Sequence, residues 1–504
     1  MMDMDVETVA EAVRGSVRLH RSNAVARGVV VDSRRVVPGS VFVAVKGERV
    51  DGHDFLAQAA SQGAVAALVD HEVPDAGIPQ IVVADTISAL GDLARKNIEL
   101  RRREKAPFTV VGITGSVGKT TTKDMLRGIL SDVAPTVAPV GSFNNEIGLP
   151  LTALEVGQRT RFLIAEMGAN HVGEIARLTG IVPPDVAVVL KVGTAHLGEF
   201  GSVERIALAK SEIVKGLVPQ GVAVLNAGDP RVAAMSSIAP GDVLWFADPD
   251  VDVAGRHCLI EATDVRVDGW DRASFTVRSG EDCERIELGI PGRHNVVNAL
   301  AAATVARHLG VELSRIAGAL SSVDHISPHR MDVSAVDRND VRFTLIDDSF
   351  NANPDSMKAG IDGLVGWGSD ETGRQNRYRI AVLGAMLELG ADGGALHSQV
   401  GRYAAEHGVD AVVAVGGPGE LDDLSRCLAD GAREVDPTRS ESVSGPELIV
   451  ETAHTTTQAD ALVERIARDH PGSVVLLKGS HASGLSALAS EWTRNGGKGG
   501  VDRS

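Results

Sequence analysis

The sequence predicts an α/β protein with three domains: a small N-terminal α/β domain, a central domain built on a parallel sheet, and a C-terminal Rossmann-like α/β domain. The chain has 504 residues, which at ordinary domain sizes is enough for about three cores. Short apolar runs bounded by glycine and proline alternate with stretches of helical spacing. Such continuous apolar runs indicate strands that are buried on both faces of a parallel sheet.

Composition excludes several classes of protein. The chain has 67 acidic and 50 basic side chains and an aromatic share of 3%, so we expect no nucleic-acid partner. The segment 1–11 lacks the basic stretch of a signal peptide, and no apolar run approaches the roughly 18 residues of a membrane helix. We therefore expect a cytoplasmic protein without a membrane span. The three cysteines have no CxxC spacing and indicate neither a disulfide framework nor a zinc site.

The N-terminal domain is predicted to span 1–106. Its short strands are separated by turn residues and are expected at Val29–Val31, Val41–Val45, Ala67–Val69 and Ile81–Val83. Apolar residues then recur at helical spacing from Ile87 to Ile98. We interpret the charged run Arg101–Lys105, which Pro107 follows, as the linker to the next domain.

The central domain is predicted to span 107–326. Its parallel strands are expected at Thr109–Ile113, Arg161–Ala165, Val186–Leu190 and Val222–Leu225. The segment Asp252–Ile290 breaks this pattern and predicts a meander of short strands before an alanine-rich helix at Asn298–His308. A domain boundary is expected within Asp324–Pro328.

The C-terminal domain is predicted to span 327–504. A second α/β sheet is expected from strands at Phe343–Ile346, Ile380–Leu383, Ala411–Val415 and Val474–Leu477. Residues 395–407 predict a helix between two of these strands. The glycine-rich stretch from Arg494 to Ser504 predicts a mobile tail.

The strongest chemical signal is a glycine-rich loop between the first central strand and a helix. It reads Gly115-Ser116-Val117-Gly118-Lys119-Thr120. Glycines allow backbone N–H groups to face a phosphate, the lysine reaches the terminal phosphates, and the threonine hydroxyl can bind Mg²⁺. This context predicts a nucleotide-binding P-loop ATPase domain.

Polar side chains follow several central strands, at the edge where an open parallel sheet binds its ligand. They are Glu166, His196, Asn226 and Asp229. Each of them alone has an ordinary alternative as a helix cap or a satisfied hydrogen-bonding group. Because Glu166 and His196 converge on the phosphate loop, an oxygen ligand and an imidazole there could complete the coordination of a cation beside ATP.

Ordered motifs along the chain resemble the Mur ligases, which are ATP-dependent amide-bond synthetases of bacterial cell-wall assembly. The motifs are Asp32-Ser33-Arg34, residues 46–53, 114–122, 143–150, 165–170, 193–197, 224–230, 292–299 and 346–354. The resemblance spans most of the chain. It implies ligation of D-alanyl-D-alanine to UDP-N-acetylmuramoyl-tripeptide through an acyl phosphate, with these small molecules as the partners.

The resemblance also implies roles for individual residues. Lys119, Glu166, His196 and Lys210 would be catalytic. ATP would contact Thr114, Gly115, Ser116, Val117, Gly118, Lys119, Thr120, Asn295, Arg330, Asp347 and Asp348. The UDP-linked substrate would contact Ser33, Arg34, Asn144 and Asn145.

The implied cofactors are ATP and two Mg²⁺ ions. Their protein ligands would be Thr120, Glu166, His196 and Lys210. A lysine beside two cations would be repelled, but the resemblance implies that Lys210 is carbamylated. A neutral amine that takes up CO₂ becomes an anionic carbamate whose oxygens suit magnesium.

Two positions depart from the pattern and leave the dipeptide contacts open. Ala385 stands where the family often has an aspartate, and His481 stands where it often has an arginine. A folate-type ligase of the same superfamily, or a regulatory ATP-binding module without catalysis, are the alternatives. The third residue of the tripeptide stays open, and we expect a monomer.

Overall fold

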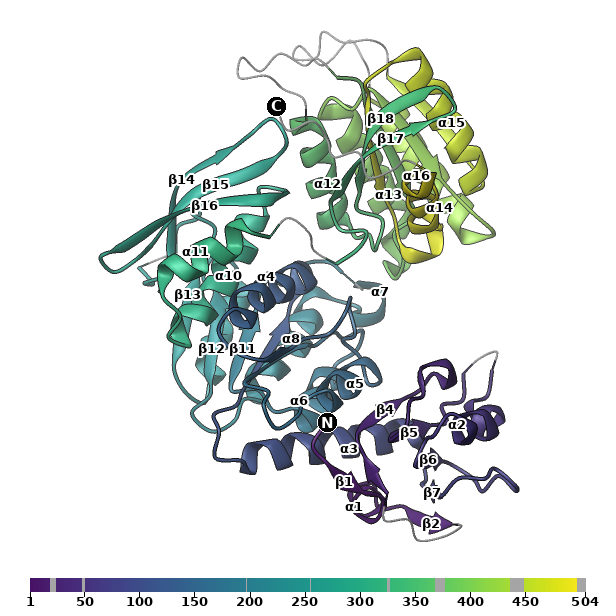
Figure 1. Cartoon of the computed structure of the whole chain (residues 1–504). Helices are drawn as coiled ribbons and strands as arrows, with labels where there is room; N and C mark the ends of the chain where they lie inside the picture. The colour runs from purple at the N-terminus through teal and green to yellow at the C-terminus, as the bar shows by residue number, and fades with distance from the viewer. Residues whose placement is uncertain are drawn as a thin grey trace.

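The computed structural model of the chain describes residues 1–18, 24–47, 50–195, 197–253, 255–323, 327–367, 377–435 and 448–495 (Figure 1). Its three main sheets follow one another along the chain, and each is covered by helices from its own part of the sequence.

The N-terminal sheet has five strands in the order β2-β7-β6-β5-β4, of which β4 to β7 run parallel and β2 is an antiparallel edge. A separate antiparallel pair joins β1 to β3. The strands are β1 (Met4–Asp5), β2 (Ser16–Arg18), β3 (Val25–Ala26), β4 (Gly28–Val30), β5 (Ser40–Val43), β6 (Ala66–Val69) and β7 (Gln80–Val82). The helices are α1 (Val6–Ala12), η1 (Ser33–Arg35), η2 (Gly52–Phe55), α2 (Leu56–Ser61) and α3 (Thr86–Arg103).

The prediction of a linker at Arg101–Lys105 is wrong in its first half. Helix α3 continues to Arg103, and Arg101 is buried. The Arg101 guanidinium donates hydrogen bonds to the carbonyl oxygens of Thr160, Ala106 and Pro107 at 2.7 to 3.0 Å. Because these bonds satisfy a buried cation, the charged run ties α3 to the central domain.

The central sheet has six strands, all parallel, in the order β13-β12-β11-β8-β10-β9. The strands are β8 (Thr109–Thr114), β9 (Thr136–Val137), β10 (Phe162–Glu166), β11 (Val186–Val189), β12 (Val222–Asn226) and β13 (Val243–Phe246). The helices are α4 (Lys119–Ser131), α5 (Gly148–Leu154), α6 (Glu174–Ile181), α7 (Leu197–Phe200), α8 (Val203–Lys215), α9 (Pro230–Ala234) and η3 (Met235–Ile238). Apolar clusters cover both faces of this sheet, as continuous apolar strands require.

An antiparallel three-stranded meander and two helices complete the central region. These elements are β14 (Glu261–Val267), β15 (Arg272–Ser279), β16 (Asp282–Pro291), α10 (Asn295–His308) and α11 (Leu313–Ser321). Helix α10 packs against α4, so the meander segment returns the chain to the phosphate loop (Figure 1).

The C-terminal sheet has six strands in the order β17-β18-β22-β19-β20-β21, and only the edge strand β17 is antiparallel. The strands are β17 (Asp332–Arg338), β18 (Val341–Asp347), β19 (Arg379–Gly384), β20 (Ala411–Val415), β21 (Ile449–Ala453) and β22 (Val474–Lys478). The helices are α12 (Pro354–Gly366), η4 (Gly390–Asp392), α13 (Gly393–Glu406), α14 (Glu420–Arg433), α15 (Thr456–Asp469), η5 (His481–Ser483) and α16 (Leu485–Asn495).

The predicted fold class is confirmed: a small α/β domain, a central parallel-sheet domain and a Rossmann-like C-terminal domain. The boundaries at 106 and 326 stay predictions. None of the helices among the described residues is long and apolar enough to cross a membrane. Most of the predicted tail lies outside the described residues, although its first residues close α16.

Candidate active site

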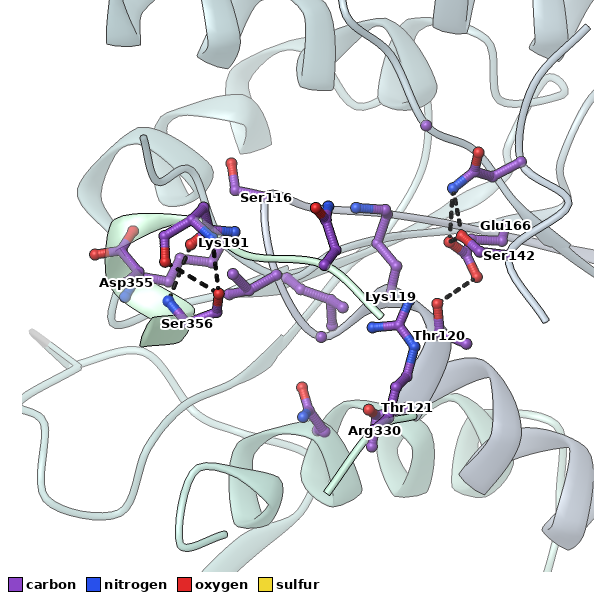
Figure 2. A pocket seen from close by; sticks show the side chains of 18 of the residues that line it. Ser116, Lys119, Thr120, Thr121, Ser142, Glu166, Lys191, Arg330, Asp355 and Ser356 are labelled. Atoms are coloured by element: carbon purple, nitrogen blue, oxygen red, sulfur yellow. Dashed lines mark hydrogen bonds between the residues drawn. The ribbon is translucent and has the colours of Figure 1, made fainter. Parts of the chain in front are cut away.

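The central and C-terminal domains together line a cavity of about 940 Å³ (Figure 2). The central domain contributes the phosphate loop and the carboxyl end of β10. The C-terminal domain contributes Arg330 and the start of α12. A ligand in this cavity would therefore contact two domains at once.

The phosphate loop connects β8 to α4 and leaves the amides at the start of α4 unbound by any side-chain cap. Gly118 is the residue before the helix and has φ of +82°, a conformation that side chains with a Cβ adopt poorly. A Cβ atom at Gly118 would also lie 2.4 Å from Asn298 Oδ1. Free amides at a helix N-terminus form an anion site, so this loop has the geometry of an anion site, and phosphate binding there stays a prediction.

Lys119 lies at the first position of α4 and folds back over the loop. Its Nζ donates a hydrogen bond to the Gly115 carbonyl at 2.8 Å. Burial lowers the pKa of Lys119, the Glu166 carboxylate raises it, and the charge of Arg330 lowers it. The half-buried ammonium therefore lies near both a carboxylate and a second cation, where a phosphate would relieve the repulsion between the two cations.

Glu166 ends β10 and is fully buried. Its Oε2 accepts a hydrogen bond from the Thr120 hydroxyl at 3.0 Å, and its Oε1 accepts from Ser142 Oγ at 3.0 Å and Asn144 Nδ2 at 2.8 Å (Figure 2). Among the described residues no cation lies within ion-pair distance of this carboxylate. Buried carboxylates usually have a cation or a metal as partner, so the site suits a bound cation.

Lys210 lies on α8 and lines the same cavity. Burial and, to a smaller extent, the charge of Lys119 lower the pKa of Lys210 to about 7, against the raising effects of Glu174 and Glu212. Its Nζ lies 5.9 Å from the centre of the Phe200 ring. A lysine of this kind has a large neutral fraction near neutral pH, which makes its amine nucleophilic.

The donor atoms of the residues at the end of β10 and the start of α4 suit magnesium. The hydroxyl of Thr120 and the carboxylate of Glu166 are adjacent oxygen ligands, which Mg²⁺ prefers. Lys210 in its amine form is not a metal ligand. His196, the remaining predicted ligand, lies outside the described residues.

Arg330 reaches the cavity from the C-terminal side. Its guanidinium carbon lies 4.3 Å from the centre of the Phe350 ring, and its buried Nε has no hydrogen-bond partner. No ion pair of Arg330 is found among the described residues. A stacked arginine without an acidic partner, close to Lys119, is a ready donor for a phosphate oxygen.

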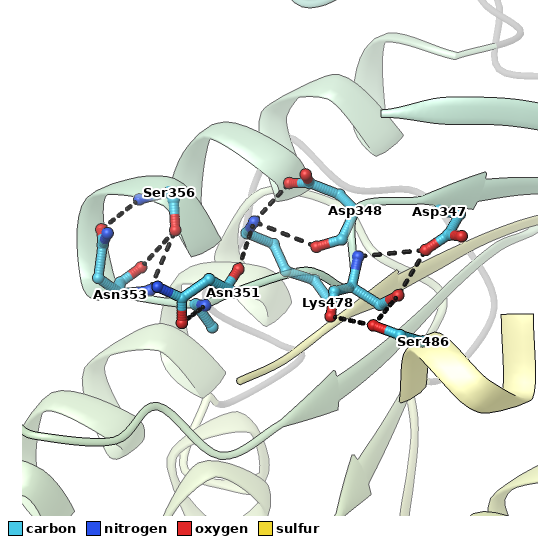
Figure 3. A network of polar contacts seen from close by, with 9 residues as sticks. Asp347, Asp348, Asn351, Asn353, Ser356, Lys478 and Ser486 are labelled. Atoms are coloured by element: carbon cyan, nitrogen blue, oxygen red, sulfur yellow. Dashed lines mark hydrogen bonds and ion pairs between the residues drawn. The ribbon is translucent and has the colours of Figure 1, made fainter. Parts of the chain in front are cut away.

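The two predicted acidic residues at the end of β18 have different environments (Figure 3). Asp348 lines the cavity and forms an ion pair with the buried Lys478. Asp347 does not line the cavity. Its carboxylate instead accepts from Ser349 and contacts His329 Nδ1 at 2.7 Å, and burial raises its pKa. Of this pair, only Asp348 lines the cavity, whereas Asp347 holds the neighbouring Ser349 and His329.

All three asparagines predicted as site residues, Asn144, Asn145 and Asn295, line the cavity. Asn295 and Asn298 both line the cavity, where Asn298 Nδ2 donates to Asn295 Oδ1 at 2.9 Å. Asn145 Oδ1 accepts hydrogen bonds from the amides of Ile147 and Gly148 and so shapes the turn before α5.

Besides Asp347, four predicted residues do not line the cavity: Thr114, Gly115, Ser33 and Arg34. Thr114 ends β8, and its hydroxyl donates a hydrogen bond to the Met167 carbonyl at 2.8 Å. Its side chain therefore ties the end of β8 to the residue that follows β10. Ser33 and Arg34 lie in the N-terminal domain, in η1. Arg34 is exposed and pairs with Asp32, which lowers the pKa of Asp32 to about 2.

Sequence analysis missed several cavity residues of the C-terminal domain. Lys478 ends β22, and its strand-end position was the available signal. Asp355 lies in the first turn of α12, and a Cβ atom at Gly193 would lie 2.5 Å from its Oδ2. Asn353 and Ser356 form a capping box at the start of the same helix (Figure 3). The close approach of Gly193 to Asp355 joins segments that are far apart in the sequence.

The fold and the site together define a nucleotide-binding ligase architecture of three domains. Three family descriptions match the chain in order. They are "Mur ligase family, catalytic domain" at 25–97, "Mur ligase middle domain" at 113–306 and "Mur ligase, glutamate ligase domain" at 329–481.

Individual relatives are similar to this chain along nearly its whole length. The chain is 38% identical to UDP-N-acetylmuramoyl-tripeptide--D-alanyl-D-alanine ligase of Mycobacterium tuberculosis over 97% of each chain. The crystal structure of MurF from Acinetobacter baumannii matches 98% of this chain and 100% of its own, with 32% identity and a TM-score of 0.81. MurF of Thermotoga maritima in complex with ADP matches 93% and 97%, with 28% identity and a TM-score of 0.72. The chain belongs to the Mur ligase family.

Proposed function

We propose that this chain is the ligase that joins D-alanyl-D-alanine to UDP-N-acetylmuramoyl-tripeptide in peptidoglycan synthesis, with cleavage of ATP to ADP and phosphate. The observation that carries this proposal is the shared cavity. It brings a phosphate loop, a buried carboxylate and an unpaired arginine from a second domain to one place. The relatives with that name cover the chain almost completely, and one neighbouring structure holds ADP.

The residues of the chain divide the work of the reaction. The amides of the phosphate loop, Lys119 and Arg330 would neutralise the terminal phosphate while the tripeptide carboxylate attacks it. The acyl phosphate so formed is then attacked by the amine of D-alanyl-D-alanine, and phosphate leaves. Such a reaction needs positioning and charge compensation and no protein nucleophile.

We propose two Mg²⁺ ions as further cofactors. Thr120 and Glu166 would hold one ion, and His196 and a carbamylated Lys210 would hold the other. When bound, these ions supply positive charge to the phosphate oxygens. The lowered pKa and the burial of Lys210 support carbamylation, since only a neutral amine reacts with CO₂.

The three domains would take three substrates. We assign the uridine nucleotide to the N-terminal domain, with Ser33 and Arg34 as contacts, ATP to the central domain, and the dipeptide to the C-terminal domain, with boundaries near 106 and 326. Asn144 and Asn145 would meet the peptide end of the UDP-linked substrate. A cytoplasmic monomer fits this assignment.

The test is release of phosphate from ATP with each substrate omitted in turn. We expect rapid phosphate release only when UDP-linked tripeptide, D-alanyl-D-alanine and Mg²⁺ are all present, and one phosphate for each amide bond formed. L-alanyl-L-alanine is the matched control for the amine and should not support turnover. A rate of phosphate release that is the same with and without the tripeptide and the dipeptide would contradict the proposal.

A further inference from the structure

We propose that the N-terminal domain carries a transition-metal site, best suited to Zn²⁺, formed by His53, Asp70 and His71. One ligand atom from each of these side chains lies within 4.8 Å of the other two. None of the three lines the large cavity. The site is therefore separate from the oxygen ligands that suit magnesium.

Two segments that are separate in the sequence meet at this cluster. His53 lies in η2, whereas Asp70 and His71 directly follow β6. The His53 side chain is buried, and the other two are exposed. One fixed imidazole and two adjustable ligands leave an open side where water can complete the coordination.

Asp51 prepares His53 for metal binding. Its Oδ1 lies 2.6 Å from His53 Nδ1 and also accepts a hydrogen bond from the His53 amide at 3.0 Å. A carboxylate in this position holds the imidazole proton on Nδ1 and leaves the lone pair of Nε2 for a metal, as is usual in zinc sites. The backbone amide of Asp70 occupies that lone pair with a long hydrogen bond of 3.2 Å, which a metal would replace.

The spacing of the ligand atoms fits one ion. His53 Nε2 lies 3.2 Å from Asp70 Oδ1. Two ligands that are each about 2.0–2.1 Å from a tetrahedral Zn²⁺ are about 3.3 Å apart, so these two atoms can bind without movement of the backbone.

The third ligand lies beside them. His71 Nδ1 contacts the same oxygen of Asp70, and the His71 ring stacks on the His53 ring with centroids 4.3 Å apart and an interplanar angle of 24°. The exposed His71 can turn outward to admit the ion. Two imidazoles and one carboxylate are the donor set of open zinc sites, whereas Mg²⁺ prefers oxygen ligands.

A metal here would clamp η2 to the turn after β6. Because the ligands meet only in the folded domain, metal binding stabilises that domain. The effect can be measured without any ligase substrate.

The test uses the full chain, freed of metal with a chelator and titrated with Zn²⁺ against a coloured competing chelator in excess Mg²⁺. We expect one Zn²⁺ site per chain that disappears in His71→Ala and in Asp70→Asn. Asp51→Asn should weaken it about 10- to 100-fold, since it removes only the outer hydrogen bond. His407→Ala, at an exposed histidine of the C-terminal domain, is the matched control and should bind as the unaltered chain does.

Two results would overturn the proposal. One is Zn²⁺ binding in His71→Ala and Asp70→Asn with the same stoichiometry and affinity as in the unaltered chain. The other is no Zn²⁺ binding by the unaltered chain at micromolar concentrations. Circular dichroism of each variant checks that the fold is kept, and a thermal midpoint that rises with Zn²⁺ only when His71 is present gives an independent second readout.

Discussion

Three of the lysines that line the cavity have different partners. Lys478 forms an ion pair with Asp348. Lys119 donates to a backbone carbonyl of its own loop. Lys210 is buried, and no carboxylate among the described residues lies within ion-pair distance of its Nζ. A buried amine without a counter-ion is costly unless it is neutral or chemically modified, which makes Lys210 the residue with the most to test.

We expect Lys210→Ala to lose most ligase activity and to recover part of it when short carboxylates such as formate or acetate are added. The added oxygens would replace those of the missing carbamate. The measurement is the ligation rate with and without the carboxylate. Lys215→Ala, at an exposed position of the same helix, is the control and should neither lose activity nor respond. Full activity of Lys210→Ala would contradict the carbamate.

The lowered pKa of Lys210 also predicts a pH dependence of stability. Between about 7, its pKa in the folded chain, and its ordinary 10.5, the unfolded chain binds more protons than the folded chain. The free energy of unfolding contributed by this group therefore rises with pH across that window and is lost as pH falls toward 7. In CO₂-free buffer, Lys210→Met should be more stable than the unaltered chain at pH 7, with a gap that narrows toward pH 10. A gap that stays constant in denaturant titrations would contradict the assigned pKa.

The residues that line the cavity were easier to predict from the sequence in the central domain than in the C-terminal domain. Thr120 and Glu166 follow directly from a loop motif and a strand end, and the structure brings their side chains within hydrogen-bond distance. Asp347 and Asp348 are neighbours at a strand end, and only their opposite orientations in the fold separate a cavity residue from a supporting one. Lys478 lies beside Asp348 because β22 pairs with β18. A single sequence does not reveal this pairing.

At the scale of elements, the start of α4 is sterically constrained by its backbone conformation and by a close neighbour. We expect Gly118→Ala to weaken ATP binding and to destabilise the chain by about 1–3 kcal/mol, because φ of +82° is strained for alanine and the new methyl would press on Asn298. Nucleotide titration and denaturant unfolding measure the two effects.

The matched control is Gly128→Ala within the same helix. A Cβ atom there meets nothing closer than 3.8 Å, and alanine is favoured over glycine in helices by about 1 kcal/mol. This variant should bind ATP normally and be at least as stable as the unaltered chain. Equal behaviour of the two variants would contradict the account of the loop.

The spacing of apolar residues predicted the strands that are continuous apolar runs. It failed where contacts with another domain determine the secondary structure. Four of the six strands of the central sheet, β8, β10, β11 and β12, are continuous apolar runs and were predicted within a residue or two of their ends. The charged residues Arg101–Arg103 appear as a linker in the sequence, yet carbonyl oxygens of a neighbouring domain satisfy Arg101 inside a helix. The edge strands β9 and β13 of the central sheet, and β17 and β21 of the C-terminal sheet, were not predicted.

At the scale of the whole molecule, the central and C-terminal domains touch through two glycines. The Gly198 amide donates to the Glu388 carbonyl at 2.9 Å, and a Cβ atom at Gly198 would lie 2.3 Å from the Gly390 nitrogen. Both residues lie at the start of short helices, α7 and η4, that meet across the domain interface. This close approach requires glycine and holds the cavity in its present shape.

We expect Gly198→Ala to prevent this contact and to lower kcat, because the C-terminal groups would no longer reach the phosphate loop. Small-angle scattering with an ATP analogue and the UDP-linked substrate should give a larger radius of gyration than for the unaltered chain. Gly180→Ala, where a Cβ atom meets nothing within 4 Å, is the control. Unchanged kcat and radius in Gly198→Ala would show that the contact is dispensable.

The three-domain architecture could be predicted from the sequence because each domain carries its own strand pattern and its own motifs. The arrangement of the domains could not, since it depends on contacts such as Gly198 with Gly390 and Gly193 with Asp355. Glycines that are needed for close approach look like loop residues in one sequence. The cavity shared by the two domains is therefore seen only in the structure and could not be predicted from the sequence. The proposed ligation depends on this cavity.

The most direct test of the account follows one oxygen atom. UDP-N-acetylmuramoyl-tripeptide labelled with ¹⁸O in its terminal carboxylate is incubated with the chain, ATP, Mg²⁺ and D-alanyl-D-alanine, and the released phosphate is analysed by mass spectrometry. If the cavity activates that carboxylate with the terminal phosphate of ATP, one labelled oxygen passes to each phosphate as each amide bond forms. Amide product formed with the departing labelled oxygen released as water and none in the phosphate would contradict the account.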